Sequence, residues 1–297
     1  MGLLWGFIGV FIFSLTLPAT KLTVGHFDPL FIGLGRAVLA GILAILALKI
    51  TKNPLLPIVI LPRLILVALG VVIGFPVFSA LALQQIPSSH GAVITGILPL
   101  ATAIAGTILA KESQTFLFWI ASFFGSAIVI FYSFWNQEVS LRFGDLFLFL
   151  AVLSAAIGYA EGGRLSKEHG GWKVISWSLV VSLPFVILIS AFTFQKNDLE
   201  APASAWFGFL YTGIFSMFLG FFAWYKGLAM SGIGKVGQIQ LIQPFLTFLF
   251  SAWILSEKID SSMIFVGLLV GFSIFLGRIR IKKKKVVLPE TKSDLIL

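Results

Sequence analysis

Uncharged hydrogen-bonding side chains in residues 236–255 form the first candidate site. Gln240, Gln243 and Thr247 are three and four residues apart, so on one continuous helix they share a face. Pro244 lies among them and, having no backbone N–H, frees the carbonyl four residues earlier. Amide, hydroxyl and carbonyl groups together offer donors and acceptors without a fixed charge.

A matching polar face is expected in residues 91–110. Thr95 and Thr102 are seven residues apart, and Pro99 frees the carbonyl of Thr95. Two such stripes could bind a solute whose charges are absent or balanced, such as an amino acid or a heteroaromatic metabolite. They could equally join helices, which is worth about 0.6 kcal/mol per contact in membranes.

Arg36 is a charged candidate, about seven residues into an apolar segment. A guanidinium there could hold a substrate carboxylate through two parallel hydrogen bonds. The alternative is that the side chain extends outward to water or holds loop carbonyls, and carries no ligand. The shallow position favours this second interpretation.

Aromatic side chains complete the candidate site. Small-molecule cavities are usually lined by apolar and aromatic groups with a few polar ones. Each of these residues could also simply pack in the core or against lipid. The candidates for a cavity wall are Phe78, Tyr159, Trp224 and Tyr225.

The acidic residues and histidines favour no catalytic, metal or cofactor site. The carboxylates that adjoin apolar segments, at Glu112, Asp145, Glu161 and Glu257, lie near segment ends, where helix capping or interfacial anchoring explains them. The three histidines are expected in separate loops, and the chain has no cysteine. We therefore expect no catalytic residue, no metal and no cofactor.

These candidates lie in a chain that is 58% hydrophobic and only 11% charged. Its apolar residues form runs of the length that crosses about 30 Å of hydrocarbon, and continuous runs indicate helices instead of barrel strands. The sequence predicts an all-α polytopic membrane protein with ten transmembrane helices. They cover residues 3–21, 30–48, 64–83, 91–110, 116–134, 145–163, 174–194, 206–230, 236–255 and 263–277.

Basic residues predict the orientation. With the N-terminus inside, fifteen lysines and arginines fall on the cytoplasmic side and four on the other. The positive-inside rule then places both termini in the cytoplasm, and we expect a multi-pass protein of the plasma (inner) membrane. The net charge of +9 does not indicate nucleic acid, because the basic residues lie in short loops and one tail.

The two halves of the chain resemble each other. A shift of 145 residues places Pro99 on Pro244 and Glu112 on Glu257, within a shared Pro-x2-Thr-x9-Glu pattern. Each half has five predicted spans, and because five is odd, the second half must enter the membrane inverted. We expect inverted five-helix repeats at 2–134 and 144–278, then a basic cytoplasmic tail at 279–297. Inverted repeats are a feature of secondary transporters.

This arrangement resembles the drug/metabolite transporter superfamily, EamA type. The resemblance rests on 80–112 and 225–257, with the proline in spans four and nine and the glutamate at each end, and on Arg36 in span two. It implies a carrier, often an exporter, with a central cavity between the halves. It does not name the solute.

The predicted function is secondary transport, as an exporter or exchanger, of small organic solutes such as amino acids or metabolites. It would work by alternating access around a midplane cavity between the two repeats. The expected partners are a small-molecule substrate and the lipid bilayer; the sequence gives no oligomeric state. The alternatives are a membrane enzyme and a structural membrane protein without transport activity. A channel is a further alternative that the sequence does not exclude. No GxxxxGK[ST] loop is present, so the chain carries no nucleotide-driven pump.

Overall fold

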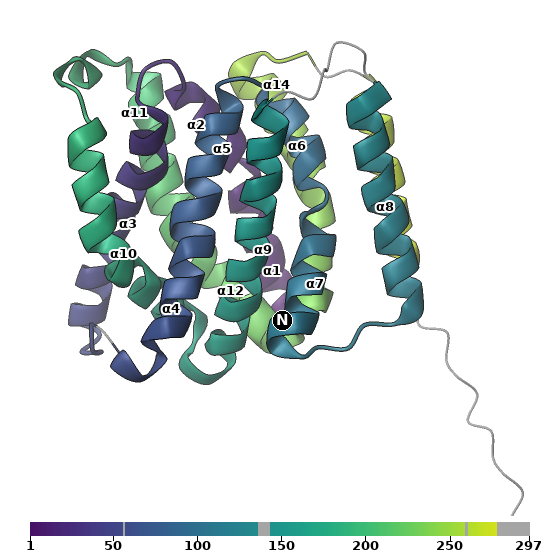
Figure 1. Ribbon diagram of the computed structural model, residues 1–297, viewed down its shortest axis with the longest axis horizontal. Helices are drawn as coiled ribbons and strands as arrows, with labels where there is room; N and C mark the ends of the chain where they lie inside the picture. Colours follow the sequence, from purple (N-terminus) through teal and green to yellow (C-terminus); the bar gives the residue numbers. More distant parts are fainter. Residues whose placement is uncertain (56, 136–142, 259–260, 278–297) are drawn as a thin grey trace, which may run out of the picture.

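The computed structural model describes residues 1–55, 57–135, 143–258 and 261–277, and every regular element in these ranges is a helix. Eight helical segments are long and apolar enough to cross a membrane. Figure 1 shows them standing side by side and joined by short loops. The chain is therefore an all-helical, polytopic membrane protein. The predicted tail at 279–297 lies outside the described residues.

Most of the eight segments are interrupted by a kink or by a short 3-10 or π-helical stretch. In chain order they are α1 (Gly2–Ser14) with α2 (Thr16–Thr23); α3 (Pro29–Ile50); η1 (Ile58–Ile60), α4 (Leu61–Val67), η2 (Ala68–Gly74) and α5 (Phe75–Leu83); α6 (Ser88–Thr95) with α7 (Leu98–Ala110); α9 (Phe143–His169); α10 (Gly171–Thr193); α11 (Ala203–Leu210), η4 (Tyr211–Leu219) and α12 (Gly220–Ser231); and α13 (Ile233–Gly237), η5 (Gln238–Ile242) and α14 (Gln243–Leu255).

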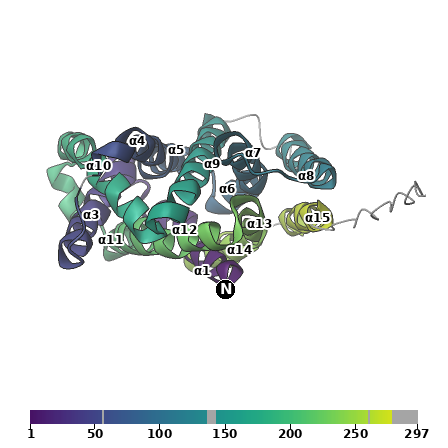
Figure 2. The ribbon, with the colours of Figure 1, turned by 90° about the horizontal axis from the view of Figure 1, so that it is seen from below.

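Two more apolar helices, α8 (Phe116–Trp135) and α15 (Ser261–Gly277), occupy the positions of predicted spans five and ten. They pack against each other at one end of the molecule (Figures 1 and 2). A short turn, η3 (Lys196–Glu200), precedes α11. The count of ten membrane spans stays a prediction.

Helix packing joins the two halves of the chain throughout the bundle. Helix α3 packs along α10 at the end opposite α8 and α15, as the end-on view of Figure 2 shows. Helix α1 packs along α12, and α9 packs along η2 and α5. The interrupted segments α6–α7 and α13–α14 meet where α6 contacts α14 and α13 contacts α7.

Prolines account for several of the helix breaks. Pro18 has no N–H to donate to the carbonyl of Ser14, and α1 gives way to α2 at Leu15. The hydroxyl of Thr247 donates to that freed carbonyl at 2.9 Å. Lipid offers no alternative donor, so a neighbouring helix must supply one.

Two faces of the bundle are named from the chain path. The N-terminal face holds the start of α1, the end of α7, the end of α9 and the start of α13. The opposite face holds the end of α2, the start of α6 and the end of α14. In Figure 1 the N-terminus marks the lower, N-terminal face.

Candidate functional site

A narrow cavity lies near the middle of the bundle, between segments of the first and second halves. The space in it that is open to the centre of a water-sized sphere is about 20 Å³. Six of the membrane-crossing segments contribute to its walls, which combine aromatic, aliphatic and polar groups. The lining residues are Phe13, Thr16, Leu17, Arg36, Val71, Phe75, Ala155, Tyr159, Ser216, Met217, Phe221 and Gln243.

Arg36 lines this cavity, so the interpretation that its side chain extends outward was wrong. The residue is only 2% exposed, although α3 begins just seven residues earlier. Towards the loop, Phe31 stacks on Phe209 at 5.1 Å within a buried aromatic cluster that covers this end of α3. The guanidinium therefore has no short path to the interface.

The charge of Arg36 has no partner within the described residues. Its Nε and Nη1 atoms are buried without a hydrogen-bond partner, and none of the ion pairs in the described ranges includes it. An unpaired buried charge is costly, by several kcal/mol. Such a group is retained where water or a ligand meets it.

Three neutral polar groups face the same cavity. Thr16 Oγ1 and Ser216 Oγ share a hydrogen bond of 2.8 Å. Gln243 is 7% exposed, and its Oε1 atom is buried without a partner. The cavity thus offers a guanidinium, an amide and two hydroxyls, while none of the described residues that line it is an aspartate or glutamate.

Aromatic rings form the apolar wall. Phe13 lies parallel to Tyr159 with centroids 6.3 Å apart, and both contact Phe221. Trp224 packs against Phe13 and Tyr159 from outside the lining and is fully buried. Rings with little freedom to move give this wall a fixed shape.

Two other predicted aromatic residues also lie outside the lining. The hydroxyl of Tyr225 donates to the carbonyl of Gly158 at 2.9 Å, so this tyrosine joins α12 to α9. Phe78 packs on a separate buried cluster with Ile86 and Leu148. Their role in binding a solute stays a prediction.

Of the predicted polar stripes, only Gln243 reaches the cavity lining. Thr247 is engaged with the carbonyl of Ser14, and Thr95 donates to its own helix at Ala92, 2.9 Å away. Gln240 lies in the 3-10 stretch η5, whereas Gln243 begins α14, and of these two residues only Gln243 lines the cavity.

Gln240 and Thr102 lie near each other instead. A Cβ atom at Gly237 would be 3.4 Å from Thr102 Cγ2 and 4.0 Å from Gln240 Oε1. The Gln240 amide atoms and the Thr102 hydroxyl are all buried without partners. This second polar group lies where α7 meets α13 and η5.

Sequence reasoning missed Thr16, Ser216 and Phe13. Thr16 lies two residues before a proline that interrupts the first span, which is a signal for exposed polar groups in a membrane helix. Ser216 lies within a π-helical stretch, which no residue pattern predicted. Such stretches frequently occur at functional sites.

Two glutamates cap helices across the halves. Glu112 accepts the backbone N–H groups of Ile233 and Gly234 at 3.0 Å each, at the start of α13. Glu257 accepts those of Ser88 and Ser89 at 3.0 and 2.9 Å, at the start of α6. The capping interpretation of these two acids is confirmed, and the partner of each lies in the other half.

Comparison with known proteins decides the family. The model of the EamA-like transporter family matches residues 1–134 and 142–278. The chain belongs to this family. The resemblance to the drug/metabolite transporter superfamily is thereby confirmed, and the chain is a membrane transporter by family.

Relatives of this EamA-like transporter carry transporter names without a named solute. The uncharacterized transporter YdeK of Bacillus subtilis (strain 168) is 43% identical over 267 residues, covering 89% of this chain and 92% of its own. The uncharacterized transporter YyaM of the same strain is 25% identical, with 80% of each chain covered. A solved crystal structure matches with a TM-score of 0.69 at 15% identity, over 93% of this chain and 96% of its own, which shows likeness of fold.

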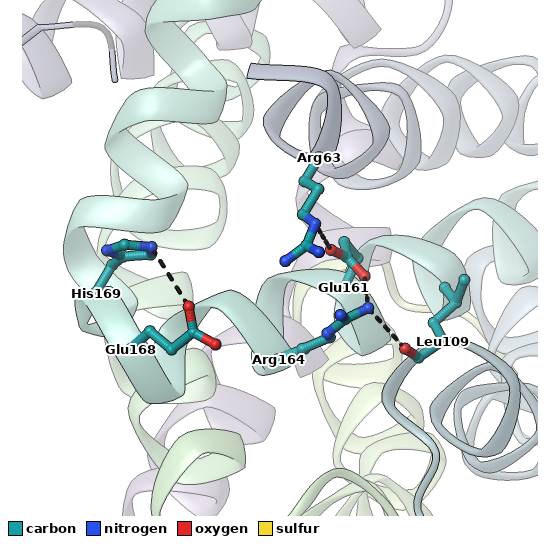
Figure 3. Close-up of polar contacts among 6 residues, drawn as sticks. All are labelled: Arg63, Leu109, Glu161, Arg164, Glu168 and His169. Atoms are coloured by element: carbon teal, nitrogen blue, oxygen red, sulfur yellow. Dashed lines mark hydrogen bonds and ion pairs between the residues drawn. The ribbon is translucent and has the colours of Figure 1, made fainter. Parts of the chain in front are cut away.

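An ion network joins three segments of this EamA-like transporter at the N-terminal face (Figure 3). Glu161 of α9, with a side chain 3% exposed, lies 3.7 Å from Arg63 of α4 and 3.7 Å from Arg164. Arg164 also donates to the carbonyl of Leu109 at the end of α7, 2.9 Å away. Glu161 is therefore paired away from the cavity lining.

The remaining acid at a segment end is paired as well. His90 Nε2 lies 2.9 Å from Asp145 Oδ1, and both side chains are buried. The expectation that His90 lies in a loop was wrong, because α6 begins at Ser88. The cap from Glu257 supports this early helix start.

Proposed function

We propose that this transporter is a secondary carrier for small organic solutes that works by alternating access around the central cavity. The observation that carries the proposal is the cavity itself: its walls come from both halves, and its unpaired polar groups meet aromatic rings. Membrane carriers bind solutes near the midplane at such an interface. The family supports transport, and no observation favours a membrane enzyme or a structural protein.

We further propose that the two halves are inverted five-helix repeats. Each span of the first half corresponds to the span five places later in the second half. If every span is replaced by its counterpart, the same pairs of spans are in contact. The pair α1 and α12 corresponds to the pair α9 and α5, while α3 with α10 and α8 with α15 correspond to themselves. A two-fold axis in the membrane plane would produce such a pairing.

Local features at an offset of 145 residues support the same proposal. Lys111 and Ser256 both end a helix in the left-handed conformation, with φ of 53°. Each is followed by a capping glutamate, and each preceding helix has its proline in the first turn. Local geometry thus repeats where the sequence pattern repeats.

The interrupted segments α6–α7 and α13–α14 are the proposed moving parts. Helix breaks leave fewer backbone bonds to resist bending. The break before α14 lies at Gln243, which lines the cavity, and the break after α6 lies at Gly96, near Leu241 and Pro244. Rocking of one half against the other would separate Glu112 from α13 on one face or Glu257 from α6 on the other. The network at Glu161 would then hold the N-terminal face closed while the opposite face opens.

Loss of the Gln243 amide should weaken solute binding. Gln243→Leu removes one neutral hydrogen-bonding group from the cavity, which is worth about 0.5–1.5 kcal/mol, or about threefold to tenfold in affinity. Gln240→Leu, outside the lining, should have the smaller effect. The measurement is half-saturation of solute flux in proteoliposomes at matched protein content. Parent-like affinity in both variants would exclude this cavity as the site.

For the orientation, we propose an inner-membrane protein with both termini in the cytoplasm. The chain has no cysteine, so single replacements give clean labels. Lys52→Cys and Asn197→Cys are both at exposed positions, in loops on opposite faces. An impermeant maleimide added to intact cells should label position 197 and leave position 52 unlabelled until the cells are opened. The reverse pattern would refute the orientation.

A further inference from the structure

We infer that the solute is an organic anion, held by its carboxylate at Arg36 with an apolar or aromatic body against the rings of the cavity. This rests on the proposed carrier function and names its class of substrate. It differs from the sequence-based expectation of a neutral or zwitterionic solute. The difference arises because Arg36 lines the cavity instead of extending outward.

The cavity carries a positive charge at Arg36. An arginine stays protonated in proteins, so the cavity carries a permanent positive charge. Two of its guanidinium nitrogens are buried without partners, and no acidic side chain lines the cavity in the part of the chain that the structure describes. A carboxylate would supply two acceptor oxygens in the geometry that the guanidinium fork matches. Binding would thereby pair a charge that the protein leaves unpaired.

The other polar groups suit the same ligand. Thr16 and Ser216 share one hydrogen bond, so one hydroxyl proton of the pair remains available to an anion. Gln243 also lines the cavity, and its buried atom without a partner is Oε1, which accepts hydrogen bonds and suits a donor on the solute. The free hydroxyl proton can complete the contacts of a carboxylate without adding negative charge.

The apolar wall defines the rest of the solute. Phe13, Phe75, Tyr159 and Phe221 supply ring surface, and Met217 and Leu17 supply aliphatic surface. An α-amino acid would bring an ammonium group that finds no carboxylate in this lining. A carboxylic acid with an unsubstituted apolar body is therefore the better match than the corresponding amino acid.

The test compares acids with matched neutral and zwitterionic probes on the purified full-length chain. The probes are acetate, hexanoate, benzoate and 3-phenylpropionate, the amide of each acid, and phenylalanine. A ligand at ten times its Kd should raise Tm by about 2–4 °C. We expect this rise with at least one of the larger acids, none with its amide, and a smaller rise with phenylalanine.

Variants connect the effect to Arg36. Arg36→Gln should abolish the Tm rise, and Arg36→Lys, which keeps the charge without the fork, should retain part of it. Lys49→Gln is the matched control, because it removes one positive charge at an exposed position of the same helix. The control should respond to the acid as the parent does.

Failure of this inference differs from failure of the carrier proposal. If no acid stabilises the parent, or if Arg36→Gln responds as the parent does, the anion site is refuted. Saturable exchange of a neutral solute that is unchanged in Arg36→Gln would refute the anion while supporting a carrier. An acid that binds through Arg36 but crosses without saturation would support the site and refute the carrier.

Discussion

Glu257→Ala should lower the free energy of unfolding by about 2–4 kcal/mol, and Glu112→Ala should do the same. Each carboxylate accepts two backbone N–H groups at the start of a helix in the other half. A hydrogen bond to a charged group contributes about 1.5–3 kcal/mol, and partial exposure of both carboxylates reduces the total. Glutamine variants should fall between, since an amide oxygen keeps an acceptor without the charge.

The measurement is denaturant or thermal unfolding of the purified chain in one detergent. Glu200→Gln, which removes an exposed carboxylate from η3, is the control and should change stability by less than about 0.5 kcal/mol. Because the two caps lie on opposite faces, the double variant should show the sum of both losses. Losses below about 0.5 kcal/mol in both single variants would mean that the caps do not hold the halves together.

Gly70→Ala should be strongly destabilising, by about 2–3 kcal/mol. A Cβ atom at Gly70 would lie 2.6 Å from the carbonyl oxygen of Ser154 and 2.8 Å from the nitrogen of Gly158. Both are backbone atoms of α9, so no side chain can rotate away and the segments must separate. Overpacking of this kind costs about 1–3 kcal/mol or more.

Gly271→Ala provides the matched control for this prediction. Among the described residues, a Cβ atom there would meet the ring of Phe245 alone, at an ordinary contact distance of 3.9 Å. The same substitution in the same solvent should therefore cost less than about 0.5 kcal/mol. Equal stability of both variants would show that η2 and α9 do not approach as closely as described. The free energy of unfolding of both glycine variants is measured in the same detergent and in the same way as for the glutamate variants.

The helical segments themselves could be predicted from the sequence. Segment length and hydropathy follow directly from the thickness of the hydrocarbon layer, so α3 at Pro29–Ile50 contains the whole predicted span 30–48. Several predicted spans were shorter than the helices. For example, the predicted span 91–110 begins after α6 has already started at Ser88. Glu257 caps that helix start from 169 residues away, and no local pattern reveals such a partner.

Only part of the candidate site could be predicted. Gln243, Tyr159 and Arg36 were chosen by residue type and do line the cavity. The expected direction of the Arg36 side chain was wrong because its depth was counted along one helix. The stacked rings of Phe31 and Phe209 cover the side of α3 towards the loop, and this contact joins two distant segments.

Residue spacing did not predict the helix interruptions. The 3-10 stretch η5 precedes α14 in the segment that carries Gln240 and Gln243. Thr247 was chosen as a polar group that could bind a solute. Its hydroxyl instead donates a hydrogen bond to the carbonyl of Ser14, which Pro18 leaves free in another span. Tertiary contacts of this kind depend on packing between segments far apart in the sequence.

Exchange across the membrane of proteoliposomes tests the carrier assignment most directly. Liposomes containing the purified chain are preloaded with an unlabelled acid or amino acid, and entry of the same labelled compound is followed. Alternating access predicts that, for at least one compound, entry saturates with concentration and is several times faster into preloaded than into empty liposomes. Entry that rises linearly and ignores the internal solute, or that equals entry into protein-free liposomes for every compound, would contradict the account.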